Sequence, residues 1–187
     1  MPFTNGNLPY LSHRFYGKFP FQHLNSLTFY DHDGVSKQLL HHLKYKSKTD
    51  IGVWFADQTF EHFKNHKMFH EVDAILKIPI HSRKLKERGY NQLDAFADRL
   101  SELFRKPIIN DAVIRNHYTK SQTQKGISDR NYATSIFSLV NENSLKSKHI
   151  LIIDDVITTG STIEQMANLL LTVSEVKISV FAMATAK

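Results

Sequence analysis

The residues best suited to chemistry lie in one short stretch, ILIIDDVITTGST, which covers residues 150–162. Two adjacent carboxylates, Asp154 and Asp155, follow four aliphatic residues and precede a run of hydroxyl residues around Gly160. Paired carboxylates can accept hydrogen bonds from sugar hydroxyls or hold a hydrated Mg²⁺ ion. Small residues at a helix start suit a phosphate, because free backbone N–H groups and the helix dipole favour an anion there. A ribose 5-phosphate would satisfy both halves of the stretch.

The polar residues of this stretch could also have a simpler role, because a strand that ends in aspartate can cap the helix that follows it. One residue is enough for a cap, however, whereas two acids and four hydroxyl residues lie within residues 154–162. Placing so many polar groups beside a sheet is costly unless they have partners. The pattern therefore favours a bound ligand. Its phosphate would contact Thr158, Thr159, Gly160, Ser161 and Thr162.

A second candidate segment, IPIHSRKLKERGYNQ (residues 78–92), is rich in cations. A run of charge is often only a solvated loop. It would also provide positive charge where a pyrophosphate leaving group develops negative charge. We expect a basic loop that follows a strand, with the cations Arg83, Lys84, Lys86 and Arg88.

The order of elements predicts how these segments meet. Strands and helices that alternate along the chain are typical of a parallel sheet with helices on both faces. Ligands of such sheets bind beyond the carboxyl ends of the strands, where the acid pair and the basic loop would both lie. We expect helices over residues 35–46, 53–69, 91–104 and 161–173, and strands over 72–80, 113–114, 150–153 and 176–186.

All thirteen residues from Ile150 to Thr162 resemble the phosphoribosyl-pyrophosphate (PRPP) motif of type I phosphoribosyltransferases. Four segments in order, LLHHLKYK, IPIHSRKLKERGYNQ, SQTQKGISDRNY and the PRPP motif, are similar to those of the ComF family of competence-related phosphoribosyltransferase-like proteins. The resemblance runs from about Phe15 to the C-terminus. It implies an α/β type I phosphoribosyltransferase fold, with a central parallel sheet flanked by helices and a small N-terminal hood lobe. Residues 1–70 would form the hood and residues 71–187 the core, in one compact unit.

The resemblance also implies roles for individual residues. Asp154 and Asp155 would be catalytic, holding the ribose hydroxyls and Mg²⁺, and residues 158–162 would bind the 5-phosphate of PRPP. The activity would be pentosyl transfer to an acceptor that the sequence does not identify. Some purine-using relatives carry an acid at the position of Ser161, which argues against hypoxanthine or guanine salvage. The pyrophosphate would contact His81, Ser82, Arg83 and Lys84, and a mobile loop would contribute Arg88 and Lys125.

The alternative is a competence or DNA-uptake factor without enzymatic activity, which binds single-stranded DNA or protein partners. A net charge of +6 suits anionic partners of either kind. The sequence has no cysteine, so it has no disulfide and lacks the four-cysteine zinc module with which ComF proteins usually begin. Either the gene never had that module or this sequence starts downstream of it. With no apolar run long enough to span a bilayer, we expect a cytoplasmic protein. We also expect it to form a dimer.

Two other patterns compete for a functional role. Asp31-His32-Asp33 resembles the nucleophile motif of haloacid dehalogenase-type phosphatases, but HLNSLTFY (residues 23–30) reads as too polar for the buried central strand that this motif requires. His62, His66 and His70 recur at four-residue steps and could line a metal site. Exposed histidines on a solvated helix are the simpler explanation of that spacing.

Overall fold

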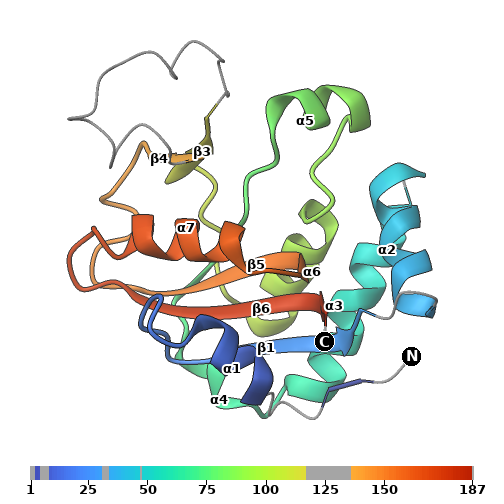
Figure 1. Cartoon of the computed structure of the whole chain (residues 1–187), viewed down its shortest axis with the longest axis horizontal. Coiled ribbons are helices and arrows are strands. Elements are labelled where there is room, and N and C mark those ends of the chain that lie inside the picture. The colour runs from blue at the N-terminus through green and yellow to red at the C-terminus, as the bar shows by residue number, and fades with distance from the viewer. Residues whose placement is uncertain (1–2, 5–8, 31–33, 47, 117–135, 187) are drawn as a thin grey trace.

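The computed structural model describes residues 3–4, 9–30, 34–46, 48–116 and 136–186. Its centre is a four-stranded parallel sheet with the strand order β1-β6-β5-β2 (Figure 1). The elements in chain order are α1 (Pro9–Phe15), β1 (Leu24–Phe29), α2 (Val35–Tyr45), α3 (Asp50–Phe63), α4 (Lys67–Glu71), β2 (Ala74–Lys77), α5 (Ser82–Arg88), α6 (Asp94–Phe104), β3 (Val113–Arg115), β4 (Phe137–Leu139), β5 (His149–Ile157), α7 (Ser161–Leu170) and β6 (Lys177–Thr185).

The central strands β5 and β6 are buried along most of their length because helices cover both faces of the sheet (Figure 1). On one face, α1 and α7 pack together, with Phe15 against Gly160. On the other face, the ring of Phe181 in β6 lies 5.2 Å from that of Phe63 and 6.5 Å from that of Phe96. The predicted parallel sheet flanked by helices is confirmed.

The N-terminal part of the chain contributes directly to this sheet. Strand β1 pairs in parallel with β6, with Leu24 opposite Val180. The sheet therefore contains strands from both sides of residue 70, the boundary that the sequence suggested between a hood lobe and the core. Residues 23–30 were expected to be too polar for a buried central strand, yet Asn25, Ser26 and Thr28 are buried in β1. The strand is nevertheless at the edge of the sheet rather than in its centre. Residues 31–33, which carry the phosphatase-like motif, lie outside the described residues.

Three other predicted elements differ from the structure. The helix expected over residues 53–69 is two helices, α3 and α4, because His66 is extended and its Nδ1 accepts a hydrogen bond from the Met68 N–H to cap α4. The strand expected over residues 72–80 is only β2, which ends before Pro79, a residue without an N–H for the sheet. The expected basic loop is helix α5, which His81 caps and which ends at Gly89 with φ of 79°.

Strand β4 was not anticipated from the sequence. It pairs with β3 in a separate two-stranded antiparallel sheet. Among the helices that the structure describes, none combines the length and the apolar character needed to cross a bilayer.

Candidate functional site

The acid pair and the basic segment line one cavity of about 360 Å³ at the carboxyl ends of the strands. The structure thus brings together two segments that are some 65 residues apart in the sequence. Its walls come from α2, the β2–α6 region, β3 and the β5–α7 junction. The lining residues are Lys44, Tyr45, Ile78, Pro79, Ile80, His81, Lys84, Arg88, Gln92, Leu93, Arg115, Asp154, Asp155, Val156, Thr158 and Thr162.

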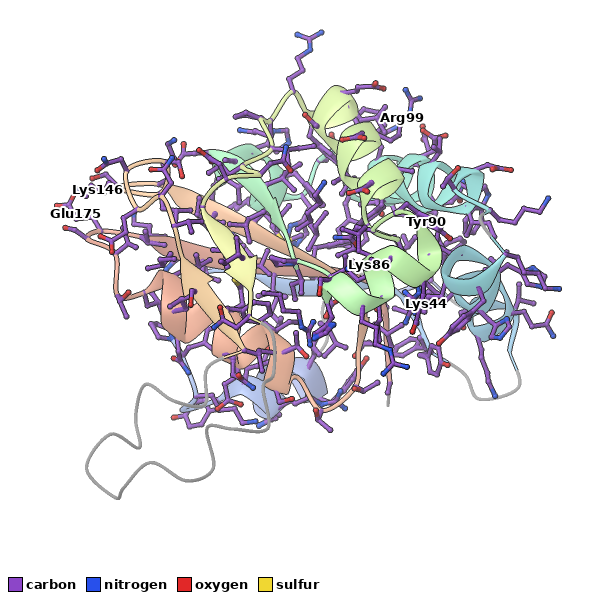
Figure 2. All side chains as sticks on the ribbon, turned by 90° about the horizontal axis from the view of Figure 1, so that it is seen from above. Lys44, Lys86, Tyr90, Arg99, Lys146 and Glu175 are labelled. Carbon is purple, nitrogen blue, oxygen red and sulfur yellow. The ribbon has the colours of Figure 1, made fainter. Side chains whose placement is uncertain are left out.

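Asp155 is the more deeply held of the two carboxylates, with 8% of its side chain exposed. Its Oδ2 lies 3.0 Å from Nζ of Lys44 and accepts a hydrogen bond of 2.9 Å from Nε2 of Gln92. The partners come from α2 and from the turn before α6. Tyr90 donates a hydrogen bond from its hydroxyl to the Leu43 carbonyl, which ties these elements together beside Lys44 (Figure 2). Asp155 is paired, yet the cavity leaves room beside it.

Asp154 has different surroundings. Its Oδ1 accepts a hydrogen bond of 2.8 Å from the Asp155 N–H. Burial and the adjacent Asp155 carboxylate raise the pKa of Asp154 to about 8, against the opposing influence of Lys44 and Arg115. Burial lowers the pKa of Arg115, which lines the same cavity. A pKa of about 8 favours the protonated form of Asp154 at neutral pH, next to the ion pair between Asp155 and Lys44.

The residues predicted to bind the 5-phosphate lie at the β5–α7 junction. Thr158 and Thr162 line the cavity, whereas Thr159 and Ser161 are exposed outside its lining. Gly160 precedes α7 with φ of 81°, a conformation that favours glycine, and it is buried. The first N–H groups of α7 have no carbonyl partner one turn earlier, as at any helix start, so they are available to an anion.

Only some of the residues predicted to contact the pyrophosphate line the cavity. His81 and Lys84 line it, but Ser82 and Arg83 do not. Arg83 is 82% exposed and its Nε pairs with Oε1 of Glu87 at 2.9 Å, one turn along the same helix. A helix turns successive side chains by about 100°, so four consecutive residues cannot all face one ligand.

Arg88, expected in a mobile loop, is instead the last residue of α5 and lines the cavity. Its Nη1 donates a hydrogen bond of 2.9 Å to Oε1 of Gln92, and its guanidinium carbon lies 4.9 Å from the centre of the Tyr45 ring. Lys125, the other residue expected in that loop, lies outside the described residues.

Four polar or aromatic residues of the cavity had no role predicted from the sequence. Lys44 and Tyr45 lie in the segment LLHHLKYK, and Gln92 ends the segment IPIHSRKLKERGYNQ, so the family resemblance contained a signal for them. Arg115 gave none, because it is a single cation in a three-residue strand.

The described residues contain no group of three or more histidine, aspartate or glutamate side chains placed to hold a metal ion. The three regularly spaced histidines make other contacts: Nδ1 of His62 lies 2.8 Å from the Gln58 carbonyl, Nε2 of His70 lies 2.9 Å from the Lys64 carbonyl, and His66 caps α4. Mg²⁺ usually takes one or two carboxylates and completes its shell with water and substrate phosphates. Asp154 and Asp155 fit that use.

Comparison with known proteins identifies the family of this chain. Residues 89–186, just over half of the chain, match the family model described as "Phosphoribosyl transferase domain", so the chain belongs to that family. Competence protein F of Haemophilus influenzae is 30% identical over 155 residues, which are 79% of this chain and 67% of that protein. DNA utilization protein YhgH of Escherichia coli K12 is 29% identical over 157 residues, covering 81% and 67%. Competence protein ComFC of Bacillus subtilis is 28% identical over 145 residues, covering 76% and 56%.

Within the phosphoribosyl transferase family, this chain is a member of the ComF group of phosphoribosyltransferase-like proteins. Solved structures are less similar. Adenine phosphoribosyltransferase from Leishmania donovani is 14% identical, with a TM-score of 0.48 over 89% of this chain and 74% of that one. Similarity at that level says nothing about ligands.

Proposed function

We propose that this protein binds PRPP, or a related ribose 5-phosphate, together with Mg²⁺ and transfers the pentosyl group to an acceptor. Asp154 and Asp155 would accept hydrogen bonds from the ribose hydroxyls, and residues 158–162 would bind the 5-phosphate. His81, Lys84 and Arg88 would contact the pyrophosphate. Substitution at the anomeric carbon would release pyrophosphate through an oxocarbenium-like state, whose positive charge the carboxylates would stabilise.

The observation that carries this proposal is the convergence of three chemical groups on one cavity. Carboxylates, a helix start with Thr158 and Thr162, and the cations of α5 all line the same 360 Å³ space. A ligand that pairs with all three must carry hydroxyl groups and two separated anionic groups. PRPP has this constitution. Mg²⁺ bound to the carboxylates and phosphates would neutralise part of the ligand's charge.

Isothermal titration calorimetry with PRPP and Mg²⁺ tests this proposal. Wild-type protein should bind, and the double variant Asp154→Asn with Asp155→Asn should bind at least about tenfold more weakly, because charged hydrogen bonds contribute about 1.5–3 kcal/mol each. Asp98→Asn is the matched control, since Asp98 is exposed on α6 and does not line the cavity. Wild-type protein that binds neither PRPP nor ribose 5-phosphate would refute the proposal.

A second candidate function is binding of single-stranded DNA, with a cellular role in competence or DNA uptake. The names of the relatives support it, and so does an exposed aromatic group at the edge of the cavity. Tyr45 is 65% exposed and Arg88 lies over its ring, an arrangement on which a base could stack. The cations of α5 would then contact the strand backbone.

The two candidates differ in their dependence on salt and on the carboxylates. Binding to DNA should weaken steeply as salt rises, survive the double aspartate substitution, and fall in Lys84→Ala and Arg88→Ala. Fluorescence anisotropy with a labelled oligonucleotide at several salt concentrations measures all three effects. Under both candidates we propose a cytoplasmic protein that forms a dimer, and analytical ultracentrifugation tests the dimer.

A further inference from the structure

Helix α1 contacts the loop of residues 158–162, and one of these contacts is made by the guanidinium group of Arg14. Nη1 of Arg14 donates hydrogen bonds to the carbonyl oxygens of Ile157, at 3.4 Å, and of Thr158. Nη2 donates to the carbonyl oxygen of Ala186 at 3.0 Å. Arg14 thus joins the end of β5, the first residue of the loop and the segment after β6. It lies about 140 residues away from the loop in the sequence.

These hydrogen bonds fix the direction of two N–H groups. In a planar trans peptide the C=O and the following N–H point in opposite directions. Because Arg14 holds the carbonyls of Ile157 and Thr158, the N–H groups of Thr158 and Thr159 point away from α1. Thr158 itself lines the cavity, so N–H groups that point away from α1 are placed to donate to a ligand there.

The neighbouring residue in α1 fixes the loop at a second point. A Cβ placed on Gly160 would lie 2.5 Å from Cζ of Phe15, a fully buried ring. The loop is therefore packed against Phe15 at Gly160. It is also bound to Arg14 through the carbonyl of Thr158, two residues before Gly160. Within the part of the chain that the structure describes, α1 provides no residue to the cavity lining. Helix α1 can influence a ligand only through the loop or through its charge.

We propose that Arg14 is a positioning residue for phosphate binding, which turns backbone N–H groups of the loop toward the 5-phosphate of the ligand. This inference rests on the proposed function, because it assumes that the loop binds a ribose phosphate. It assigns a role to a residue outside the PRPP motif and outside the cavity. The fork of the guanidinium is what matters, since it reaches three carbonyl oxygens at once, whereas an ammonium group presents a single nitrogen.

The test compares two ligands and two variants by calorimetry. Arg14→Lys keeps the charge but loses the fork, and Arg14→Met loses both. For each variant we expect the affinity for ribose 5-phosphate to fall at least about tenfold. The affinity for Mg²⁺-pyrophosphate, which would contact α5, should stay within about twofold of wild type. Lys18→Ala is the matched control, because it removes a 3.1 Å ion pair between Lys18, three residues after α1, and Glu164 of α7 without touching the loop carbonyls.

A second measurement uses wild-type protein and so does not depend on whether a variant folds. In NMR spectra, the amide signals of Thr158 and Thr159 should shift downfield when ribose 5-phosphate is added, because their N–H groups would donate to the phosphate.

The outcomes separate this inference from the proposed function. Wild-type protein that does not bind ribose 5-phosphate would refute the function itself. If wild type binds, unchanged affinity in both variants would overturn the role of Arg14. Full affinity in Arg14→Lys with loss in Arg14→Met would also overturn it, because charge alone would then explain the effect. Equal loss for both ligands, or amide signals that do not move on binding, would overturn it as well.

Discussion

Lys44 of α2 and Asp155 of β5 form an ion pair with 3.0 Å between Nζ and Oδ2, and both side chains are mostly buried. The pair connects the N-terminal part of the chain to the end of a central strand. It also leaves Asp155 with a cation before any ligand arrives. The same contact that holds α2 over the cavity thus also orients one of the two acids.

Removing Lys44 should destabilise the protein. Lys44→Met leaves the Asp155 carboxylate, 8% exposed, with Gln92 as its remaining side-chain partner. We expect the free energy of unfolding to fall by about 1–3 kcal/mol in urea denaturation. The matched variant Lys46→Met changes an exposed lysine one residue beyond the helix and should stay within about 0.5 kcal/mol of wild type. Equal losses in the two variants would mean that the ion pair contributes nothing specific.

The cations of α5 are neighbours in the sequence, but their positions on the helix predict unequal contributions to pyrophosphate binding. Lys84 lines the cavity, whereas Arg83 pairs with Glu87 and Lys86 is exposed outside the lining. Lys84→Ala should therefore weaken Mg²⁺-pyrophosphate binding by at least about tenfold, because it removes a charged contact. Arg83→Ala and Lys86→Ala should change the affinity by less than about twofold, apart from a small effect of net charge. Calorimetry measures all three. Similar losses for Arg83→Ala and Lys84→Ala would favour the sequence-based assignment, which gave both residues to the pyrophosphate, over the structure.

The acid pair and the loop after it, which the sequence predicted most directly, are contiguous in the chain. A buried strand, two acids and a glycine-containing helix start follow one another, so local rules for strands, turns and caps place Asp154, Asp155 and the loop without knowledge of the rest of the fold. The parallel sheet was predictable for a related reason, since alternating strands and helices permit few arrangements.

The remaining part of the site depends on contacts between distant segments. Lys44 reaches Asp155 only because α2 lies over the carboxyl end of the sheet, and no local pattern specifies that position. Helix α5 was missed because a short run of charged residues resembles a solvated loop, while its cap at His81 and its end at Gly89 are set by backbone geometry. Arg14 was missed for a third reason: its partners are main-chain carbonyls, which no side-chain pattern reveals.

Two glycines with nearly the same backbone conformation provide a controlled test of the contact between α1 and the loop. Gly160 has φ of 81° and a Cβ there would meet the Phe15 ring, whereas Gly89 has φ of 79° and a Cβ there would meet nothing within 4 Å. Gly89→Ala should cost about 1 kcal/mol through backbone strain alone. Gly160→Ala should cost at least about 1 kcal/mol more, because the ring or the loop must move.

Urea denaturation of the two alanine variants measures this difference directly. Losses that agree within experimental error would show that Phe15 yields to the added methyl group without cost, and that α1 does not fix the shape of the loop. A larger loss in Gly160→Ala should be accompanied by weaker binding of ribose 5-phosphate, since the same displacement changes the direction of the loop's N–H groups.

The raised pKa of Asp154 predicts how stability depends on pH. Burial and Asp155 move that pKa from 3.8 to about 8 in the folded protein. Between these values the unfolded chain loses the proton while the folded protein keeps it. The contribution of this group to the free energy of unfolding therefore decreases as pH rises from about 4 to about 8, by at most about 1.4 kcal/mol per pH unit. Below that range both states hold the proton, and above it neither does.

Asp154→Asn removes this titration while keeping a side chain of similar size. In urea denaturation without Mg²⁺, the variant should gain stability relative to wild type as pH rises, with the largest advantage near pH 8 and little near pH 4. Asp98→Asn, on the exposed surface of α6, should keep the pH dependence of wild type. If the difference between Asp154→Asn and wild type were the same across this range, Asp154 would not hold a proton in the folded protein.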